Sequence, residues 1–454
     1  MDNLEYKLDD PGEINQDIKN KKSQRKFIII IVLLILIILA FVALFIIELI
    51  RAKNLSDDKD DLQKKNDYLT KRNEILKDIS VKAGSDMLLF SFGKRLINIS
   101  YAEDNAIINS FVKNGSNYFE ELGEINNGKN YPKNERNVYD LYIPSSAEEN
   151  KDKYNKIILF IHGGAWILGE KEQLELFCTT YGSLGFITAT MGYTLLMSKY
   201  EQANIFRMID EITATIKSIK KELIKAGFNG DKLEMAISGG SAGGHLSLLY
   251  AYGFGKNSPI PIKYIINICG PVTLEDYYYI QLKNMDDTLD SIDSKSIKKA
   301  REEGKVIPIS QVWTGESFDS SKKFLVMLFN VFLGRSPNED FDQLYDEKND
   351  TIIYSEKYYE IFKKINYSNP VFYINENSIP TLNIYGGKDD IAGIGQYAYL
   401  QEKFDEHKNP NFTLVYSRYA PHAPFEIGSE NGIEKIKETN YQILEYANKY
   451  FTKN

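Results

Sequence analysis

A pentapeptide that matches G-x-S-x-G lies near the middle of the chain, at residues 239–243. The apolar run KLEMAIS precedes it, and HLSLLYAYG follows with the composition of a helix. A sharp strand-to-helix turn holds such a serine in a strained backbone conformation, so that its hydroxyl projects from the sheet beside the N-terminus of a helix. The pattern therefore predicts that Ser241 is a nucleophile for attack on a carbonyl carbon.

A second glycine-rich motif, HGGAW at residues 162–166, follows the apolar segment KIILFI. Hydrolysis of an ester or amide requires N–H donors that are already aimed at the oxyanion of the tetrahedral intermediate. Glycine lets the backbone approach the substrate closely. We predict that the backbone N–H groups of Gly163, Gly164 and Ala165 form this oxyanion hole together with that of Ala242.

The chain contains four histidines, so the search for a general base is short. His162 is expected to fix its loop by hydrogen bonds, and His245 to lie against the sheet on the helix that follows Ser241. His407 lies in a charged helix end, EKFDEHKNP. Only His422 occupies a proline-bounded loop after an apolar strand, FTLVYS, from which a base can reach the nucleophile.

The acid of such a triad is expected between serine and histidine in chain order. The segment IPTLNIYGGKDDIAG offers Asp389 and Asp390 on the turn after an apolar strand. Asp389 is the better candidate because it falls at the first turn after the glycine pair, and Asp390 is the alternative. The carboxylate would hold the imidazole tautomer and stabilise the imidazolium.

From about Val138 onward, short apolar segments alternate with helical patterns. Apolar residues between Ile205 and Leu223 recur at helical spacing, as expected for a helix packed on a sheet. This alternation predicts an α/β fold with a mostly parallel sheet flanked by helices. The segments read as strands are VYDLYIP, KIILFIHGG, GFITATMGY, KLEMAISGG, YIINICG and TLNIYGG.

The stretch at about 271–364 does not fit this alternation, and we expect it to form a helical cap inserted after the YIINICG strand. It contains a charged helical piece around SIKKAREEGK and an apolar helix at KKFLVMLFNVFLG. Tyr277, Tyr278, Tyr279 and Trp313 could line a substrate pocket beneath the cap. We favour the alternative that they pack in the interior of the cap.

An uncharged run of 21 residues extends from Phe27 to Ile47, long enough at about 1.5 Å per residue to cross a bilayer. No small-x-small cleavage site follows it, so we predict a transmembrane signal anchor at 27–50. A buried helix of a soluble domain is seldom so long and so uniformly apolar. Lysine and arginine crowd the preceding tail, 1–26, which puts the tail in the cytoplasm and the rest of the chain outside, in a single-pass protein of the cell membrane.

Residues 51–81 are polar and are predicted to form a helical linker or stalk between the membrane and a hydrolase domain at 82–454. Leucines recur every seven residues within 55–76, a spacing that could form the seam of a homodimeric coiled coil. The companion core positions are polar, so a solvated amphipathic helix is favoured. The leucines are Leu55, Leu62, Leu69 and Leu76.

The composition excludes several classes of protein. A net charge of −8 argues against nucleic-acid binding, which normally requires a basic face. Two cysteines in apolar surroundings, Cys178 and Cys269, exclude a disulfide framework and a C-x-x-C motif. Neither a metal motif nor a nucleotide-binding fingerprint is present, so no cofactor is expected.

The motifs together resemble those of the α/β-hydrolase superfamily, and most of all its hormone-sensitive-lipase-like and acetyl-xylan-esterase- or kynurenine-formamidase-like carboxylesterases. HGGAW matches the H-G-G-x-W motif of that family, and ISGGSAGGHLSLL matches its G-x-S-A-G-G-H region. NYSNPVFYINENSIPTLNIYGGKDDI resembles the stretch that leads to the family's acid. The resemblance covers about 138–451 and implies that Ser241, Asp389 and His422 form the catalytic triad.

Two departures from the family pattern concern substrate class. The long stretch between Ser241 and Asp389 implies an enlarged cap, and APHAP replaces the usual glycine-flanked context of the histidine. We expect a serine hydrolase that cleaves small-molecule or lipid esters through an acyl-enzyme. An amidase, formamidase or peptidase with the same triad, and a non-catalytic binding protein of the cell surface, remain the alternatives.

Overall fold

The computed structural model describes residues 93–102, 106–108, 130–200, 202–282, 293–309, 321–418, 420–422 and 432–453. All of them belong to a compact unit that extends from Ile75 to Asn454. The predicted basic tail, membrane anchor and linker at 1–81 lie outside the described residues. Within the described part of the chain, no helix is both long and apolar enough to cross a bilayer.

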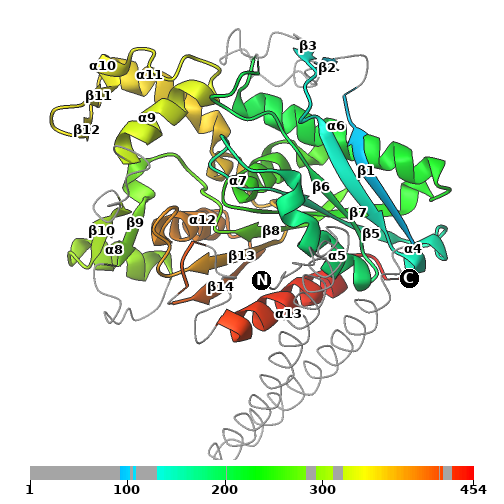
Figure 1. The fold of residues 1–454 in the computed structure, drawn as a ribbon. Coiled ribbons are helices and arrows are strands. Elements are labelled where there is room, and N and C mark those ends of the chain that lie inside the picture. The colour runs from blue at the N-terminus through cyan, green and yellow to red at the C-terminus, as the bar shows by residue number, and fades with distance from the viewer. Residues whose placement is uncertain are drawn as a thin grey trace, which may run out of the picture. The chain divides into compact units, whose positions relative to one another are not determined.

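An eight-stranded sheet forms the centre of the unit, in the order β1-β4-β6-β5-β7-β8-β13-β14 (Figure 1). Strand β4 pairs antiparallel with both β1 and β6, and all pairs from β6 to β14 are parallel. The prediction of a mostly parallel sheet is therefore confirmed. The strands are β1 (Lys94–Ser100), β4 (Val138–Ile143), β5 (Asn155–Ile161), β6 (Ile187–Met191), β7 (Leu233–Gly240), β8 (Ile262–Ile268), β13 (Thr381–Gly386) and β14 (Phe412–Ser417).

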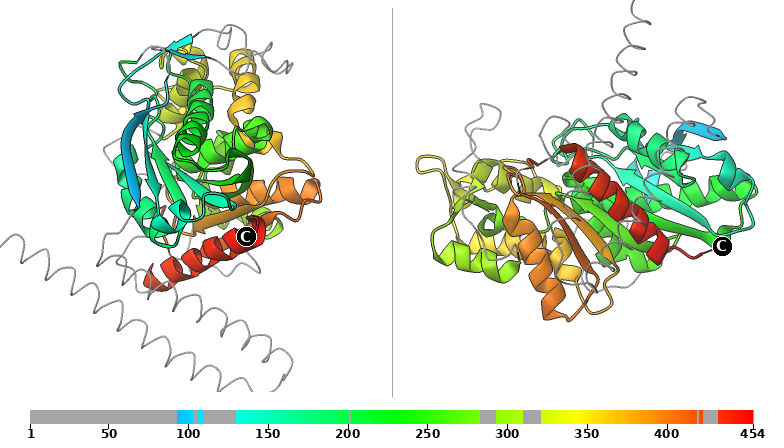
Figure 2. Two further views of the ribbon diagram at one scale, coloured as in Figure 1. Left: turned by 90° about the vertical axis from the view of Figure 1, so that its right-hand side faces the viewer. Right: turned by 90° about the horizontal axis from the view of Figure 1, so that it is seen from below.

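Helices cover both faces of the sheet, because the central strands are apolar on both sides. In β5, Ile157 and Leu159 belong to one hydrophobic cluster, whereas Ile158 and Phe160 belong to another. Successive side chains of a strand point to opposite faces, so the two clusters lie on opposite sides of the sheet. The first cluster includes residues of α6 (Ile205–Lys225) and α7 (Ala242–Leu249); the second includes residues of α5 (Glu175–Ser183) and α13 (Gly432–Tyr450) (Figure 2).

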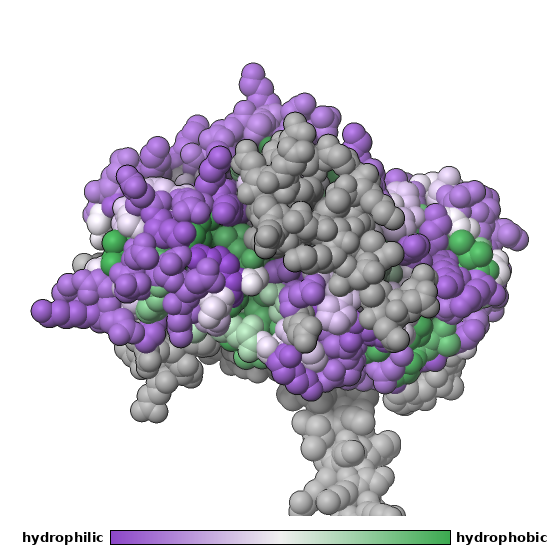
Figure 3. Space-filling model, turned by 90° about the horizontal axis from the view of Figure 1, so that it is seen from above, coloured by the Kyte–Doolittle hydropathy of each residue, from purple (hydrophilic) through white to green (hydrophobic). Residues whose placement is uncertain are grey.

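Helix α6 follows the predicted apolar stripe. Its side chains from Ile205 to Leu223 at helical spacing are fully buried, and the Asn204 side chain caps its N-terminus by accepting a hydrogen bond from the backbone N–H of Arg207. The surface of the unit is mostly hydrophilic on the face shown in Figure 3, where apolar residues are exposed only in separate patches.

The insertion between β8 and β13 contains short strands as well as helices. Strand β9 (Ile280–Leu282) pairs antiparallel with β10 (Val306–Pro308), and β11 (Tyr345–Asp346) with β12 (Thr351–Ile352). Runs of two or three residues carry no periodic signal, so the sequence predicted only helices here. The helices of this insertion are α8 (Ser294–Glu302), α9 (Ser321–Phe332), α10 (Phe341–Leu344) and α11 (Glu356–Ile365).

The remaining elements lie outside this insertion. Helix α12 (Ile394–Glu406) connects β13 to β14, and the short helix α4 (Ser145–Glu148) follows β4. Strand β2 (Ala106–Ile108) pairs antiparallel with β3 (Asn130–Pro132), apart from the central sheet.

Candidate active site

Ser241 occupies the sharp turn between β7 and α7. Its backbone has φ 54° and ψ −122°, a conformation that costs a non-glycine residue free energy. Glycines beside it permit the turn, because a Cβ on Gly239 would lie 2.3 Å from the backbone carbon of Gly243, and one on Gly243 would lie 2.0 Å from the carbonyl oxygen of Ile161. The backbone N–H of Ser241 donates to the carbonyl of Ile268 at 2.8 Å, which ties the turn to the end of β8.

The HGGAW loop lies directly against this turn. A Cβ on Gly163 would come within 2.9 Å of the carbonyl oxygen of Gly240 and 3.3 Å of the Ser241 Cβ. Gly164, Ala165 and Trp166 all have positive φ, at 110°, 47° and 62°.

The backbone N–H groups of this loop are available to a ligand. No acceptor among the described residues bonds the N–H groups of Gly163, Gly164 and Ala165 or that of Ala242, the first residue of α7. Free donors beside a helix N-terminus suit an oxyanion.

His162 holds the HGGAW loop in place. Its Nε2 lies 3.3 Å from an Arg136 guanidinium nitrogen, which can only donate, and its Nδ1 lies 2.8 Å from the carbonyl oxygen of Gly163, which can only accept. The proton therefore resides on Nδ1. The ring stacks on Tyr193 at 4.1 Å, and burial lowers the pKa of His162 to about 4, so the imidazole is neutral.

His245 connects the same loop to the segment before β13. Its Nδ1 accepts a hydrogen bond from the Trp166 indole at 3.3 Å, and its Nε2 donates to the carbonyl of Ser368 at 2.9 Å. Burial lowers the pKa of His245 to about 3. Both nitrogens are thus occupied and the ring is neutral, whereas His407 lies exposed at the end of α12. Neither histidine is placed to act as a base at Ser241.

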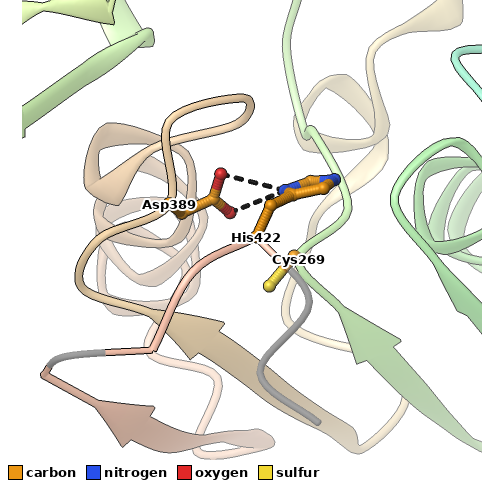
Figure 4. Close-up of side chains that lie close together, drawn as sticks. All are labelled: Cys269, Asp389 and His422. Atoms are coloured by element: carbon orange, nitrogen blue, oxygen red, sulfur yellow. Dashed lines mark hydrogen bonds and ion pairs between the residues drawn. The ribbon is translucent and has the colours of Figure 1, made fainter. Parts of the chain in front are cut away.

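His422 and Asp389 face each other from the loops after β14 and β13 (Figure 4). The His422 Nδ1 lies 2.9 Å from each carboxylate oxygen of Asp389. Its Nε2 is buried, points away from Asp389 and bonds no group among the described residues. The ring is therefore oriented by the carboxylate while its second nitrogen remains available.

Asp389 is fully buried, and its charge is stabilised by donors. Burial alone raises the pKa of this carboxyl, but hydrogen bonds from His422 and from the backbone N–H groups of Ile391 and Ala392 outweigh burial and bring the net pKa below its usual value. Asp390, in contrast, is exposed. The pairing with His422 thus involves Asp389, the first of the two candidates.

Cys269 lies beside this pair, and its Sγ, one Asp389 oxygen and one His422 nitrogen lie within 4.8 Å of one another. These are groups that bind zinc. The donor chemistry does not fit a metal, however, because the carboxylate and Nδ1 bond each other and burial raises the pKa of the Cys269 thiol well above its usual value. A metal ligand would have to be the thiolate.

A cavity of about 430 Å³ opens at Ser241 and extends beneath the insertion. Ser241, Ala165 and Trp166 form one part of its lining, and most of the remainder comes from 271–328 and is apolar. Tyr277 and Tyr279 line it, contrary to the favoured prediction that they pack inside the cap. Tyr278 instead stacks on Tyr399 at 3.9 Å, and Trp313 lies outside the described residues.

Sequence reasoning missed three side chains of this region. Arg136 supports the HGGAW loop through His162, and Arg301 and Lys322 line the cavity. The charged pattern around Arg301 is that of a solvated helix face, and no motif surrounds Arg136. Nothing in the sequence distinguishes these three from the other lysines and arginines of the chain.

Comparisons with known proteins agree with these motifs. The family model described as BD-FAE matches residues 139–318, a range that includes the HGGAW loop and Ser241 and ends before Asp389. The isoprenylcysteine alpha-carbonyl methylesterase of Arabidopsis thaliana is 30% identical over 112 residues, and a probable enzyme of the same name from Oryza sativa subsp. japonica is 29% identical. The match covers 25% of this chain and about a quarter of each relative.

Solved structures of esterases share low sequence identity with the chain. Esterase B from Lactobacillus Rhamnosis is 14% identical, with a TM-score of 0.45, over 84% of this chain and 97% of that one. A thermophilic esterase from Thermogutta terrifontis is 16% identical, with a TM-score of 0.43, over 69% of this chain and 88% of that one.

The two buried histidines make folding sensitive to acid. In an unfolded chain a histidine titrates near pH 6.5, whereas His162 and His245 titrate at about 4 and about 3 when folded. Between those values the unfolded state binds more protons, so the free energy of unfolding falls as the pH is lowered from about 6.5 towards 4. Thermal unfolding of the purified full-length chain at pH 7.5 and pH 5.0 should show this as a lower Tm in acid.

His245→Gln keeps a donor for Ser368 and removes the titration, so we expect a smaller drop in Tm between the two pH values. His407→Gln, at the exposed histidine, is the matched control and should leave the drop unchanged. Equal drops for the wild type and His245→Gln would contradict the assignment.

Proposed function

We propose that this chain is a serine α/β-hydrolase that cleaves carboxylic esters through an acyl-enzyme intermediate. The observation that carries the proposal is the position of Ser241, which has a positive φ between β7 and α7 and lines a cavity together with Ala165 of the HGGAW loop. The BD-FAE match, the names of the methylesterase relatives and the sheet order support the same chemistry.

In this mechanism the Ser241 hydroxyl attacks the ester carbonyl while the His422 Nε2 takes its proton. Asp389 holds the opposite nitrogen and stabilises the imidazolium without accepting its proton. His422 then protonates the leaving alcohol, and water, activated by the same nitrogen, releases the acid.

The developing oxyanion is bound by backbone donors. The candidates are the N–H groups of Gly163, Gly164, Ala165 and Ala242, which have no other acceptor among the described residues. Because they are fixed before the substrate arrives, the donors need no rearrangement as charge develops, and loss of one oxyanion-hole donor typically raises the barrier by about 3–4 kcal/mol. Buried His162 and His245 hold this loop from two sides.

An ester is favoured over an amide because the relatives are named as esterases. The same triad serves amidases, formamidases and peptidases, so this choice rests on the relatives and not on the triad. A non-catalytic binding protein would not need to retain a strained serine, an oriented histidine and a buried carboxylate together. The pairing of His422 with Asp389 therefore favours an enzyme.

We also propose that residues 27–50 anchor the protein in the cell membrane, with the hydrolase domain outside the cytoplasm. The support is the uncharged run of 21 residues from Phe27 and the lysines and arginines that precede it. Dimerisation through the leucine repeat at 55–76 stays a prediction. The substrate reaching such an anchored domain would be a small-molecule or lipid ester.

Full-length protein in detergent should hydrolyse p-nitrophenyl butyrate with a burst of p-nitrophenol equal to the enzyme concentration, provided deacylation is slower than acylation. Ser241→Ala should lower kcat by about 10³-fold or more, because the nucleophile is lost while the fold is kept. Ser183→Ala, at the end of α5, is the control and should remain active. Full activity of folded Ser241→Ala would refute the assignment of the nucleophile.

Variants of the neighbouring carboxylates Asp389 and Asp390 test which of the two acts as the acid of the triad. Asp389→Asn should lower kcat by about 10³–10⁴-fold, because an amide no longer stabilises the imidazolium and favours the wrong tautomer. Asp390→Asn changes the same charge one residue away on an exposed side chain, and should retain kcat within a few-fold. The opposite order of activities would make Asp390 the acid.

The anchor is tested in cells that express the full-length chain. It should sediment with membranes and resist extraction by high salt and alkaline carbonate, and protease added to intact cells should digest the hydrolase domain. A variant lacking 27–47 should be recovered in the soluble fraction. Recovery of the intact wild type in the soluble fraction would disprove the anchor.

A further inference from the structure

We propose that the preferred ester carries a carboxylate, separated from the ester group by an apolar segment, and that the Arg301 guanidinium binds this carboxylate in the cavity. The inference rests on the proposed esterase activity and specifies its substrate class. It makes Arg301 a residue that determines specificity through binding, at a distance from the chemistry at Ser241.

The guanidinium of Arg301 is held in place at the cavity wall. Arg301 lies in the last turn of α8, and its Cζ lies 3.3 Å from the centre of the Tyr277 ring. One of its terminal nitrogens donates to the carbonyl of Tyr277, and both residues line the cavity. Stacking covers one face of the planar group, so its free N–H donors point outward in the plane, the geometry that a carboxylate matches with two parallel hydrogen bonds.

These donors are available. The bond to Tyr277 uses one N–H of the five that an arginine side chain offers. Among the described residues, no carboxylate lies within ion-pair distance of Arg301. Within the described part of the chain, Arg301 is thus a fixed cation that faces the cavity without a counter-ion.

The charged side chains around the cavity favour an anion. Lys322 is the second cation of the lining, and its Nζ donates to the carbonyl of Asp350 at 3.0 Å. Asp276 also lines the cavity, and its carboxylate accepts the Tyr354 hydroxyl at 3.1 and 3.2 Å. Counted over the described lining residues, two cations and one anion give a positive balance, although the chain as a whole has a net charge of −8.

The rest of the cavity lining predicts the kind of group that connects the carboxylate to the ester within the substrate. Most of the other lining side chains, from the paired strands β9 and β10 and from α9, are apolar, among them Val306, Ile309, Leu325 and Leu328. An apolar stretch of substrate would displace water along these side chains. Exclusion of water would also strengthen the attraction between carboxylate and guanidinium.

The test compares p-nitrophenyl monoesters of linear dicarboxylic acids of increasing length with p-nitrophenyl alkanoates of the same length, using full-length protein in detergent. For the best length, we expect the KM of the charged ester to be lower by about tenfold or more, the order expected for a charge-assisted hydrogen-bonded pair. Salt should weaken the preference, because the cavity is open to solvent.

Arg301→Gln should remove the preference for the charged ester, so that the KM values of the charged and the neutral ester become similar. Arg301→Lys keeps the charge and should retain part of the preference. It also provides a second variant in case the glutamine variant does not fold. Lys298→Gln is the matched control, since Lys298 lies on the same helix, is exposed and does not line the cavity. This control should keep the full preference.

The inference is overturned if wild-type protein hydrolyses neutral esters and shows no preference for the charged ones, or if Arg301→Gln keeps the preference. It is also overturned if Lys322→Gln, and not Arg301→Gln, removes the preference. Failure of the proposed function is distinguishable, because the wild type would then hydrolyse neither series.

Discussion

The close approach of three backbone segments around Ser241 is the constraint on which the rest of the site depends. The β7–α7 turn packs so tightly on the end of β5 that a single methyl group at Gly243 would overlap the carbonyl of Ile161. This packing keeps Ser241 in a backbone conformation that it would not adopt alone. It also brings the turn against the HGGAW loop, whose N–H groups bond no acceptor in the described part of the chain and lie beside the N-terminus of α7.

A buried polar network extends this constraint to the strand that leads to Asp389. The Asn267 side chain accepts from the backbone N–H of Gly270 and donates to Asn383 and to the Tyr385 hydroxyl, so β8 is fixed to β13. The Tyr385 hydroxyl donates to the carbonyl of Gly270 and the Asn383 amide to backbone carbonyls, so the network is satisfied within the sheet and helps to specify the register of the strands. Because Asp389 follows β13 and His422 follows the adjacent β14, the register of the parallel strands brings Asp389 to His422.

Local motifs predicted the parts of the site that depend on backbone shape. The G-x-S-x-G and HGGAW segments could be recognised because the spacing of their glycines indicates where backbone segments approach closely. The alternation of strands and helices predicted the parallel sheet. The choice between Asp389 and Asp390 needed the structure, since only burial and the bond to His422 separate two neighbouring carboxylates.

The residues that line the cavity were harder to predict from the sequence. Tyr277 and Tyr279 were expected inside the cap, but a tyrosine run has no pattern that distinguishes interior from cavity wall. Arg301 lies on a helix whose other cations are solvated, so its role depends on the stacking partner that folding supplies. Most of the cavity lining therefore comes from the insertion, which has the weakest sequence signal.

The central claim is that Ser241 is an activated nucleophile, and labelling with a fluorophosphonate tests it most directly. Full-length wild-type protein, Ser241→Ala and His422→Ala are treated with the probe, and the adduct is located by mass spectrometry of the peptides. We expect one adduct per wild-type chain, on Ser241, no adduct on Ser241→Ala, and labelling of His422→Ala that is slower by orders of magnitude. A folded wild-type protein that does not react, or an adduct on another residue, would contradict it.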